Sequence, residues 1–330
     1  LSVEDINKVL ELGNFFKLKK KEKNKNYPIL TGRTVINLFF EPSTRTLISF
    51  EIAAKRLGAD VVNMNIQGSS LRKGETLFDT AQTIGAMNPD LVIIRHNEDN
   101  SAEKISNLLD CPIINAGEGI NEHPTQALLD LYTIRRELLD KGKNINGLSI
   151  AMIGDLRHGR TVHSLTKLLS LYDGVRVTLV SPRELSLPDG IVESMRNAGV
   201  DVRIRHELAK SIVDVDIVYS TRIQEERFSN KQEADLYRGK FRLNQAIYTQ
   251  YCQPNTVIMH PLPRDSRSDA NELDNDLDDN PNLAIFRQTD NGLLVRMALF
   301  ALVLDVADKV EKFSADVNWY NSRQSSKITR

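Results

Sequence analysis

The chain has 330 residues, of which 41% are hydrophobic and 26% charged, an ordinary composition for a globular protein. Its net charge of −1 argues against general attraction to nucleic acid or an anionic membrane, so we expect neither as a partner. Cys111 and Cys252 are far apart and lack a surrounding motif, which favours a reducing, cytoplasmic setting and gives no support for a zinc site.

Apolar runs and helical periodicity alternate along the chain. In the first half we predict strands at residues 35–40, 60–65, 91–95 and 113–115, and helices at 47–57, 76–87 and 124–139. In the second half we predict strands at 148–153, 176–180, 216–220 and 256–259, with helices at 161–171 and 190–198. This alternation predicts an α/β fold of two similar-sized domains, each a parallel sheet flanked by helices.

The polar joint at residues 140–147 is the expected domain boundary. We therefore expect domains at 1–139 and 140–290, with a C-terminal helix at about 291–312 that packs back on the first domain. Residues 314–330 are polar and are expected to form a flexible tail. The acidic residues 269–279 lack the spacing of a calcium-binding loop and are interpreted as a solvated loop.

The most informative segment is the one in which Ser43, Thr44, Arg45 and Thr46 lie between a predicted strand and a predicted helix. The first N–H groups of a helix lack intrahelical partners, and the helix dipole favours an anion there. Helix capping would explain one hydroxyl, but not three beside an arginine, so we predict a phosphate site. No G-x-x-x-x-G-K-[ST] motif is present, and use of a nucleoside triphosphate therefore has no support.

Polar side chains also follow the other predicted strands. They include Arg95, His123, Gln126, Arg160, Thr161, Arg222 and Gln224, and the His-Pro-Leu-Pro motif after the strand at 256–259 adds Leu262 and Pro263 as candidates. In open α/β sheets, ligands bind beyond the carboxyl ends of the strands. We therefore expect an active site rich in arginine, histidine and hydroxyl groups, in the cleft between the two domains.

Some of these residues also have structural explanations that the sequence leaves open. Arg95 could form a buried ion pair, although we favour a ligand, and His123 could equally well cap a helix. Arg222 could form a salt bridge instead of binding a carboxylate. Gly154 and Asp155 could belong to a dinucleotide-binding turn, but the G-x-G-x-x-G pattern is missing, which leaves a nicotinamide-dependent oxidoreductase as a distant alternative.

Together these residues resemble the aspartate/ornithine carbamoyltransferase family over about residues 2–310. The Ser-Thr-Arg-Thr turn at 43–46, the Arg-His pair at 95–96 and the His-Pro-Thr-Gln sequence at 123–126 are similar to its carbamoyl phosphate half. Thr-Arg-Ile-Gln at 221–224 and His-Pro-Leu-Pro at 260–263 resemble the aspartate-specific members. Ornithine-specific members carry a cysteine where this chain has Pro261.

The resemblance implies transfer of the carbamoyl group of carbamoyl phosphate to L-aspartate, in pyrimidine synthesis, with no cofactor and no metal. It implies that Arg45, Thr46, Arg95 and His123 are catalytic. The implied carbamoyl phosphate site comprises Ser43, Thr44, Arg45, Thr46, Arg95, His123, Gln126, Leu262 and Pro263. The implied aspartate site comprises Lys73, Arg160, Thr161, Arg222 and Gln224.

The polar loop at residues 69–76 is either an ordinary surface loop or a lid over an anion. The resemblance implies that Ser69 or Ser70, together with Lys73, reaches the active site of a neighbouring subunit. It therefore implies a homotrimer with shared active sites, and it leaves open whether regulatory chains bind. The rival hypotheses are a carbamoyltransferase for ornithine or a related amine, and a catalytically silent family member that acts as a scaffold.

Overall fold

The computed structural model describes residues 1–21, 26–65, 76–228, 230, 235–265, 267 and 269–312. Contacts divide the chain into two compact units. The first unit contains Leu1–Arg95, Ala102–Ile114 and Leu293–Arg330, and the second contains His96–Ser101 and Asn115–Gly292. Ser69, Ser70, Lys73 and the predicted tail lie outside the described residues, and the domain boundary at residues 140–147 stays a prediction.

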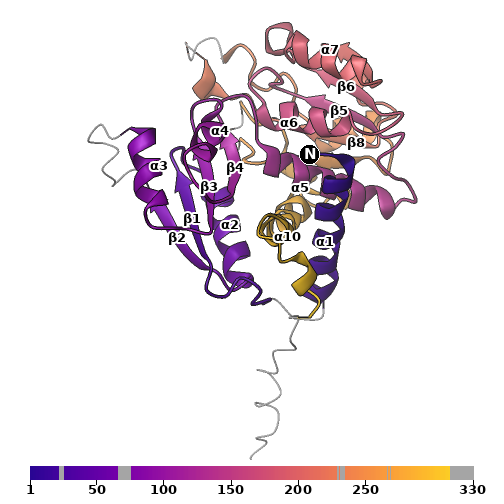
Figure 1. The fold of residues 1–330 in the computed structure, drawn as a ribbon. Coiled ribbons are helices and arrows are strands. Elements are labelled where there is room, and N and C mark those ends of the chain that lie inside the picture. The colour runs from indigo at the N-terminus through magenta and orange to yellow at the C-terminus, as the bar shows by residue number, and fades with distance from the viewer. Residues whose placement is uncertain are drawn as a thin grey trace, which may run out of the picture. The chain divides into compact units, whose positions relative to one another are not determined.

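The first sheet has the strand order β2-β1-β3-β4, and β1 pairs in parallel with both β2 and β3 (Figure 1). The elements of this part of the chain are α1 (Val3–Lys21), β1 (Thr34–Phe39), α2 (Thr44–Arg56), β2 (Asp60–Asn65), α3 (Leu77–Gly85), β3 (Leu91–His96), α4 (Ser101–Ser106) and β4 (Ile113–Glu118). All four strands were predicted. The largely buried β3 contains the continuous apolar run that is typical of parallel strands, whereas the edge strand β2 is mostly exposed.

Helices cover both faces of the strands in the first unit. Alternate residues of β1 and β3, such as Ile36 and Val92, pack with Ala81 and Ile84 of α3 in one apolar cluster. Figure 1 shows α2 on the other side of these strands from α3. Phe50 of α2 is fully buried there. The phosphate-site segment is thus held between a buried strand and a helix that has one buried face.

The last long helix, α10, spans Ile285–Val303 and is followed by the short 3₁₀ helix η7 (Ala307–Lys309). It begins and ends earlier than the predicted 291–312. The earlier end is explained by Asp305, which adopts the left-handed conformation (φ 52°) that stops a helix. In the first unit, Arg296 of α10 donates to the Ser49 hydroxyl over 2.9 Å and lies 4.8 Å from the Phe50 ring centroid. Phe300 meets the same ring edge to face.

The second unit is built on a five-stranded sheet of order β7-β6-β5-β8-β9, in which every neighbouring pair is parallel. Its elements are α5 (Pro124–Leu139), β5 (Ser149–Ile153), α6 (Arg160–Leu169), β6 (Arg176–Val180), η3 (Arg183–Leu185), α7 (Asp189–Asn197), β7 (Asp201–Arg205), η4 (Ala209–Ser211), β8 (Ile217–Ser220), η5 (Glu225–Arg227), α9 (Gln245–Tyr251), β9 (Val257–Met259) and η6 (Asn275–Leu277). The α/β prediction of two parallel sheets flanked by helices is confirmed.

The prediction of only four strands in the second half is wrong, because β7 is a fifth. This strand is the edge of its sheet, and four of its five residues are exposed. Its sequence, Asp-Val-Arg-Ile-Arg, therefore lacks the apolar run by which the other strands were recognised. The period-two spacing of Val202 and Ile204 was the available signal.

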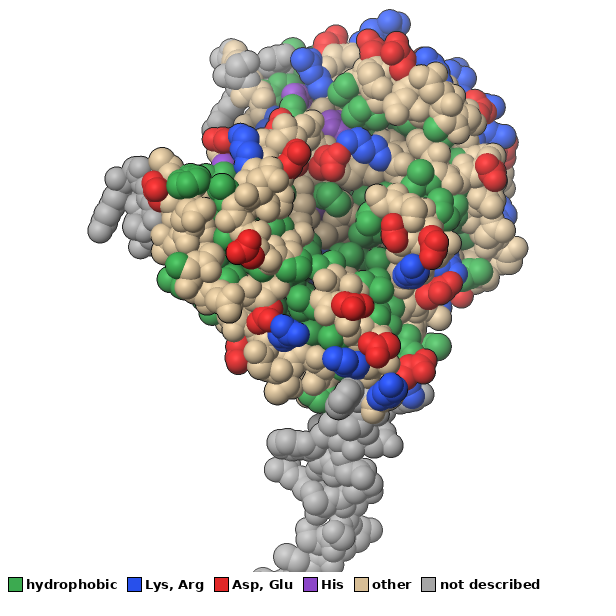
Figure 2. Space-filling model, viewed as in Figure 1, with side chains coloured by type: hydrophobic (Ala, Val, Ile, Leu, Met, Phe, Trp, Pro, Cys, Tyr) green, Lys and Arg blue, Asp and Glu red, His purple; other side chains and the backbone are tan. Residues whose placement is uncertain are grey.

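No helix among the described residues has the length and apolar character needed to cross a bilayer. Over the face drawn in Figure 2, Lys and Arg side chains are interspersed with Asp and Glu side chains. This distribution agrees with the net charge of −1.

Candidate functional site

In the first sheet, the predicted phosphate-binding residues lie at the point where the strand order reverses. The chain runs from β1 to β2 on one side and then crosses to β3 on the other side, so the switch lies between β1 and β3. Phe39 of β1 is in register with Arg95 of β3, and the Phe40 N–H donates to the Arg95 carbonyl over 2.7 Å. Ser43–Thr46 therefore follow the end of β1, and Arg95 lies at the end of the neighbouring strand β3.

Helix α2 begins at Thr44, which is earlier than the predicted residue 47, so Thr44, Arg45 and Thr46 form its first turn. Ser43 is the N-cap residue, but its side chain makes no capping hydrogen bond. The capping explanation for this serine is therefore not borne out. Thr46 is buried, whereas Thr44 and Arg45 are exposed at the helix start, where backbone N–H groups and the dipole favour an anion.

Arg95 forms the buried ion pair that the sequence had left as the second choice. Its Nη2 lies 2.8 Å from Oε2 of Glu41, and only 9% of the arginine side chain is exposed. Glu41 was missed as a site residue, although it stands directly before Pro42 at the end of β1. The carboxylate fixes the direction of the guanidinium fork, so that its remaining donors have a defined orientation.

In the second sheet, the strand order reverses between β5 and β8. Gly154 follows β5 with φ +112°, and a Cβ placed on it would lie 2.1 Å from the carbonyl oxygen of Thr221, which follows β8. The two strand ends therefore touch backbone to backbone at Gly154. Arg160 and Arg222, both predicted to bind aspartate, come after these two strand ends.

We predict that Gly154→Ala strongly destabilises the protein, since alanine would meet both the unfavourable φ and the Thr221 carbonyl. The loss should exceed about 3 kcal/mol in unfolding free energy, measured by urea titration. Gly142→Ala is the matched control, because Gly142 also has a positive φ (+70°) but no atom within 4 Å of the position that a Cβ would take. It should cost about 1–2 kcal/mol. Equal losses in the two variants would contradict the close-approach explanation.

Asp155 organises the segment that carries the predicted aspartate-binding residues. This carboxylate is fully buried and accepts hydrogen bonds from the backbone N–H groups of His158 (3.0 Å) and Gln224 (3.2 Å). The Gln224 side-chain amide in turn donates to the His158 carbonyl over 2.7 Å. Asp155, which the sequence placed in a candidate dinucleotide turn, therefore holds two loops of the second unit together.

Three arginines near the predicted aspartate site, Arg160, Arg222 and Arg227, have partners within the second unit. Arg222 forms a forked ion pair with Glu226, with an Nη1–Oε2 distance of 3.0 Å. This is the salt bridge that the sequence had left open. The Arg160 Nη1 donates to the Gly119 carbonyl over 2.8 Å, and Arg227 Nη2 donates to the same oxygen over 3.1 Å. These contacts orient the guanidinium groups before any ligand binds.

His123 and Gln126 lie at the start of α5, as predicted. His123 is the buried N-cap residue, and its side chain makes no capping hydrogen bond. Its backbone N–H donates to the Ser164 hydroxyl over 2.9 Å, which joins the start of α5 to the middle of α6. The Gln126 amide nitrogen donates to the buried carboxylate of Asp130 over 2.9 Å.

Leu262 and Pro263 follow β9, the neighbour of β8. The Leu262 N–H donates to Nδ1 of His260, so the proton of that imidazole is on Nε2, which lies 2.7 Å from Oε1 of Glu272. Glu272 is buried, and Leu273 and Leu277 belong to the apolar core of this unit. The prediction that residues 269–279 form a solvated loop is therefore wrong for this part, because the two leucines anchor it.

A separate group of charges surrounds Glu225. Hydrogen bonds from the guanidinium groups of Arg238 and Arg267 lower the pKa of Glu225 to about 2. Arg267 also pairs with Asp265. Arg238 and Arg267 are not among the residues that the sequence predicted to bind a substrate.

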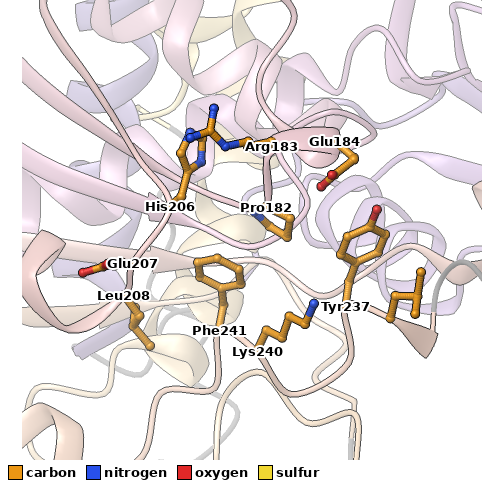
Figure 3. A pocket seen from close by; sticks show the side chains of 10 residues that line it. Pro182, Arg183, Glu184, His206, Glu207, Leu208, Tyr237, Lys240 and Phe241 are labelled. Carbon is orange, nitrogen blue, oxygen red and sulfur yellow. The ribbon is translucent and has the colours of Figure 1, made fainter.

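One cavity of about 580 Å³ lies in the second unit near η3 and the segment after β7. Figure 3 shows that its lining mixes cations, such as Arg183 and Lys240, with the carboxylates Glu184 and Glu207. Lys240 lies 5.5 Å from the centroid of the Tyr237 ring. None of the predicted site residues within the described part of the chain lines this cavity.

Two family models match the chain. The "Aspartate/ornithine carbamoyltransferase, carbamoyl-P binding domain" matches residues 1–136, and the "Asp/Orn binding domain" of the same family matches residues 146–303. The aspartate carbamoyltransferase catalytic subunit of Saccharophagus degradans is 62% identical over 89% of this chain and 88% of its own length. The corresponding subunit of Cellvibrio japonicus is 57% identical over 98% of this chain and 95% of its own length.

Solved structures of aspartate transcarbamoylases are also similar to this chain. The crystal structure of Trypanosoma cruzi aspartate transcarbamoylase in complex with carbamoyl phosphate and aspartate has a TM-score of 0.83 and 37% identity, covering 91% of this chain and 93% of that one. The catalytic subunit of the M. jannaschii enzyme has a TM-score of 0.81 and 38% identity, covering 94% and 96% of the two chains. With both halves of the sequence matched in order, this chain belongs to the aspartate/ornithine carbamoyltransferase family.

Proposed function

We propose that this chain is an aspartate carbamoyltransferase, which transfers the carbamoyl group of carbamoyl phosphate to the amino group of L-aspartate in pyrimidine synthesis. The observation that carries this function is the placement of anion-binding side chains at the switch point of each sheet. Ser43–Thr46 and Arg95 occupy the switch point of the first sheet, and Arg160 and Arg222 follow that of the second. Carbamoyl phosphate and aspartate are both anions, as these donors require.

The first substrate is assigned to residues that start helices or end strands. Ser43, Thr44, Arg45 and Thr46 bind the phosphate together with Arg95. Thr46, Arg95 and His123 donate toward the carbamoyl oxygen, and Gln126 holds the carbamoyl amine. The backbone near Leu262 and Pro263 orients the attacking amine. These roles are supported by the helix start of α2, by the oriented Arg95 guanidinium and by the buried position of His123.

The second substrate is assigned to Arg160, Thr161, Arg222 and Gln224, whose donors suit two carboxylates. The neutral amine of aspartate attacks the carbamoyl carbon, and the bond to the phosphate oxygen breaks. Donors aimed at the carbonyl oxygen stabilise the negative charge that develops in the tetrahedral intermediate. The departing phosphate takes up the amine proton, so that the reaction needs no protein base.

A colorimetric assay for N-carbamoyl-aspartate tests this function directly. The purified chain should form the product from carbamoyl phosphate and aspartate, and it should not carbamoylate ornithine at a comparable rate. Product from ornithine alone would favour a carbamoyltransferase of different specificity. Saturable phosphate binding without any product would favour the scaffold alternative.

The same proposal assigns each substrate to one domain. We assign carbamoyl phosphate binding to residues 1–139, with the C-terminal helix, and aspartate binding to residues 140–290.

Cys111 and Cys252 are both free thiols, which suits catalysis in the reducing cytoplasm. Regulatory chains are left as partners to be tested by copurification.

We also propose a homotrimer in which Ser69 or Ser70 and Lys73 of one subunit complete the active site of the next. Inactive Ser43→Ala chains mixed with inactive Lys73→Ala chains should recover part of the activity, since some sites in a mixed trimer would then carry neither substitution. The recovered rate is measured after denaturation and joint refolding, with each variant refolded alone as its control. Mixed trimers that remain as inactive as the parents would contradict site sharing.

A further inference from the structure

One buried carboxylate in the second unit collects hydrogen bonds from three different elements. Asp130, in the middle of α5, is fully buried. It accepts from the Gln126 amide nitrogen over 2.9 Å, from the Gln288 amide nitrogen of α10 over 2.5 Å and from the Tyr219 hydroxyl of β8 over 2.7 Å. A buried ionised group needs such donors, because it has lost its hydration.

Each hydrogen bond to Asp130 has a fixed direction, with the carboxylate as the acceptor. Burial, followed by the nearby Asp130 charge, raises the pKa of Tyr219 well above its usual value, and a hydrogen bond with Thr161 opposes this only in part. Tyr219 therefore keeps its proton and donates. An ionised carboxylate has no hydrogen to offer, so each amide that faces it must present its nitrogen.

This constraint decides which way two glutamine side chains point. With its nitrogen on Asp130, Gln126 must turn its carbonyl oxygen Oε1 away from the Asp130 carboxylate. Gln288 likewise presents its nitrogen to Asp130, and its Oε1 accepts a hydrogen bond from the His260 backbone N–H over 3.1 Å. His260 in turn accepts from the Leu262 N–H over 2.8 Å. A connected series of hydrogen bonds therefore links Gln126 to the segment at Leu262, through Asp130, Gln288 and His260.

We propose that Asp130 is a positioning residue that fixes the Gln126 amide so that its oxygen, and not its nitrogen, faces the carbamoyl –NH₂ group. The inference rests on the proposed function, which gives Gln126 the task of holding that group. An –NH₂ group is a donor and requires an acceptor. An amide free to rotate would present its own –NH₂ in half of its orientations, and two donors would then face each other.

Ligands that differ in one group test this inference without turnover. Phosphonoacetamide carries both a phosphonate and the –NH₂ group, whereas inorganic phosphate lacks the –NH₂ group. Calorimetric titration of Asp130→Asn should show about tenfold weaker binding of phosphonoacetamide, as expected for one lost hydrogen bond, and unchanged binding of phosphate. The asparagine keeps the shape of Asp130 but can donate, so that it no longer selects one orientation of Gln126.

Tyr219→Phe is the matched control, since it removes a different donor from the same carboxylate and leaves the Gln126 contact in place. It should lower the free energy of unfolding without weakening the binding of phosphonoacetamide. In a Gln126→Ala background, Asp130→Asn should have no further effect on the binding of either ligand, because the group through which it acts is gone.

Equal weakening of both ligands by Asp130→Asn, or an effect that persists in the Gln126→Ala background, would overturn the positioning role and leave the proposed function intact. Failure of the unmodified protein to prefer phosphonoacetamide over phosphate would overturn the proposed function and this inference with it. Neutron diffraction of the unmodified protein needs no variant. It should place both side-chain deuterium atoms of Gln126 on the atom facing Asp130, and deuterium on the opposite atom would refute the inference.

Discussion

Replacing Arg45 with alanine should lower kcat for carbamoyl-aspartate formation by about 10²–10³-fold, the usual cost of removing one donor from a site that stabilises developing negative charge. Arg45 lies in the first turn of α2, where the helix dipole also favours an anion, so its guanidinium adds to a field that already selects phosphate. The measurement is a steady-state assay at saturating aspartate.

Lys55→Ala provides the control for Arg45→Ala. Lys55 is a cation in the last turn of the same helix and pairs with Glu51 on an exposed face. A surface pair of this kind contributes about 0.3–0.5 kcal/mol to stability, and its loss should leave kcat near that of the unmodified protein. If Arg45→Ala kept more than a tenth of the activity, the phosphate site would have to lie elsewhere.

Arg222→Gln should raise the KM for aspartate by about 100-fold, since glutamine cannot replace a charged, forked pair of hydrogen bonds to a carboxylate. The structure shows this guanidinium making such a fork with Glu226. Affinity for inorganic phosphate should be unchanged, because the phosphate is assigned to residues of the first unit. Initial rates over a range of aspartate concentrations, with phosphate titrations beside them, give both values.

Arg203→Gln is the control for charge removal, since Arg203 lies on the exposed edge strand β7. It should leave the KM for aspartate unchanged. An Arg222→Gln enzyme that saturates with aspartate normally but binds phosphate weakly would reverse the assignment of the two substrates.

Much of the fold follows from the sequence because buried parallel strands carry an apolar signal that does not depend on distant residues. The buried strand β6 has the predicted bounds. The bounds of the more exposed edge strand β2 were also correct, as were those of α5, which begins with the rigid Pro124. The start of α2 was placed too late, because Thr44 and Thr46 look like loop residues. Only the position of the chain after β1 makes them the first helical turn.

The donors of the candidate site were recognised from their types and spacing, whereas the carboxylates that orient them were not. Glu41 follows β1 whereas its partner Arg95 lies in β3, and Asp155 contacts Gln224 from another loop. Asp130 stands among apolar residues of a helix, but the sequence around it does not identify Tyr219 and Gln288, the distant residues that donate to it. Such partners depend on tertiary packing, which a local pattern does not contain.

The edge strand β7 has a consequence for self-association. Its unpaired backbone groups could extend the sheet by adding a strand from a second molecule, which is a common route to aggregation. Asp201, Arg203 and Arg205 stand at alternate positions along it, and all three are exposed. Charged side chains on an edge strand are one of the devices by which natural sheets discourage such pairing. The charges along β7 therefore disfavour strand addition at this margin of the sheet.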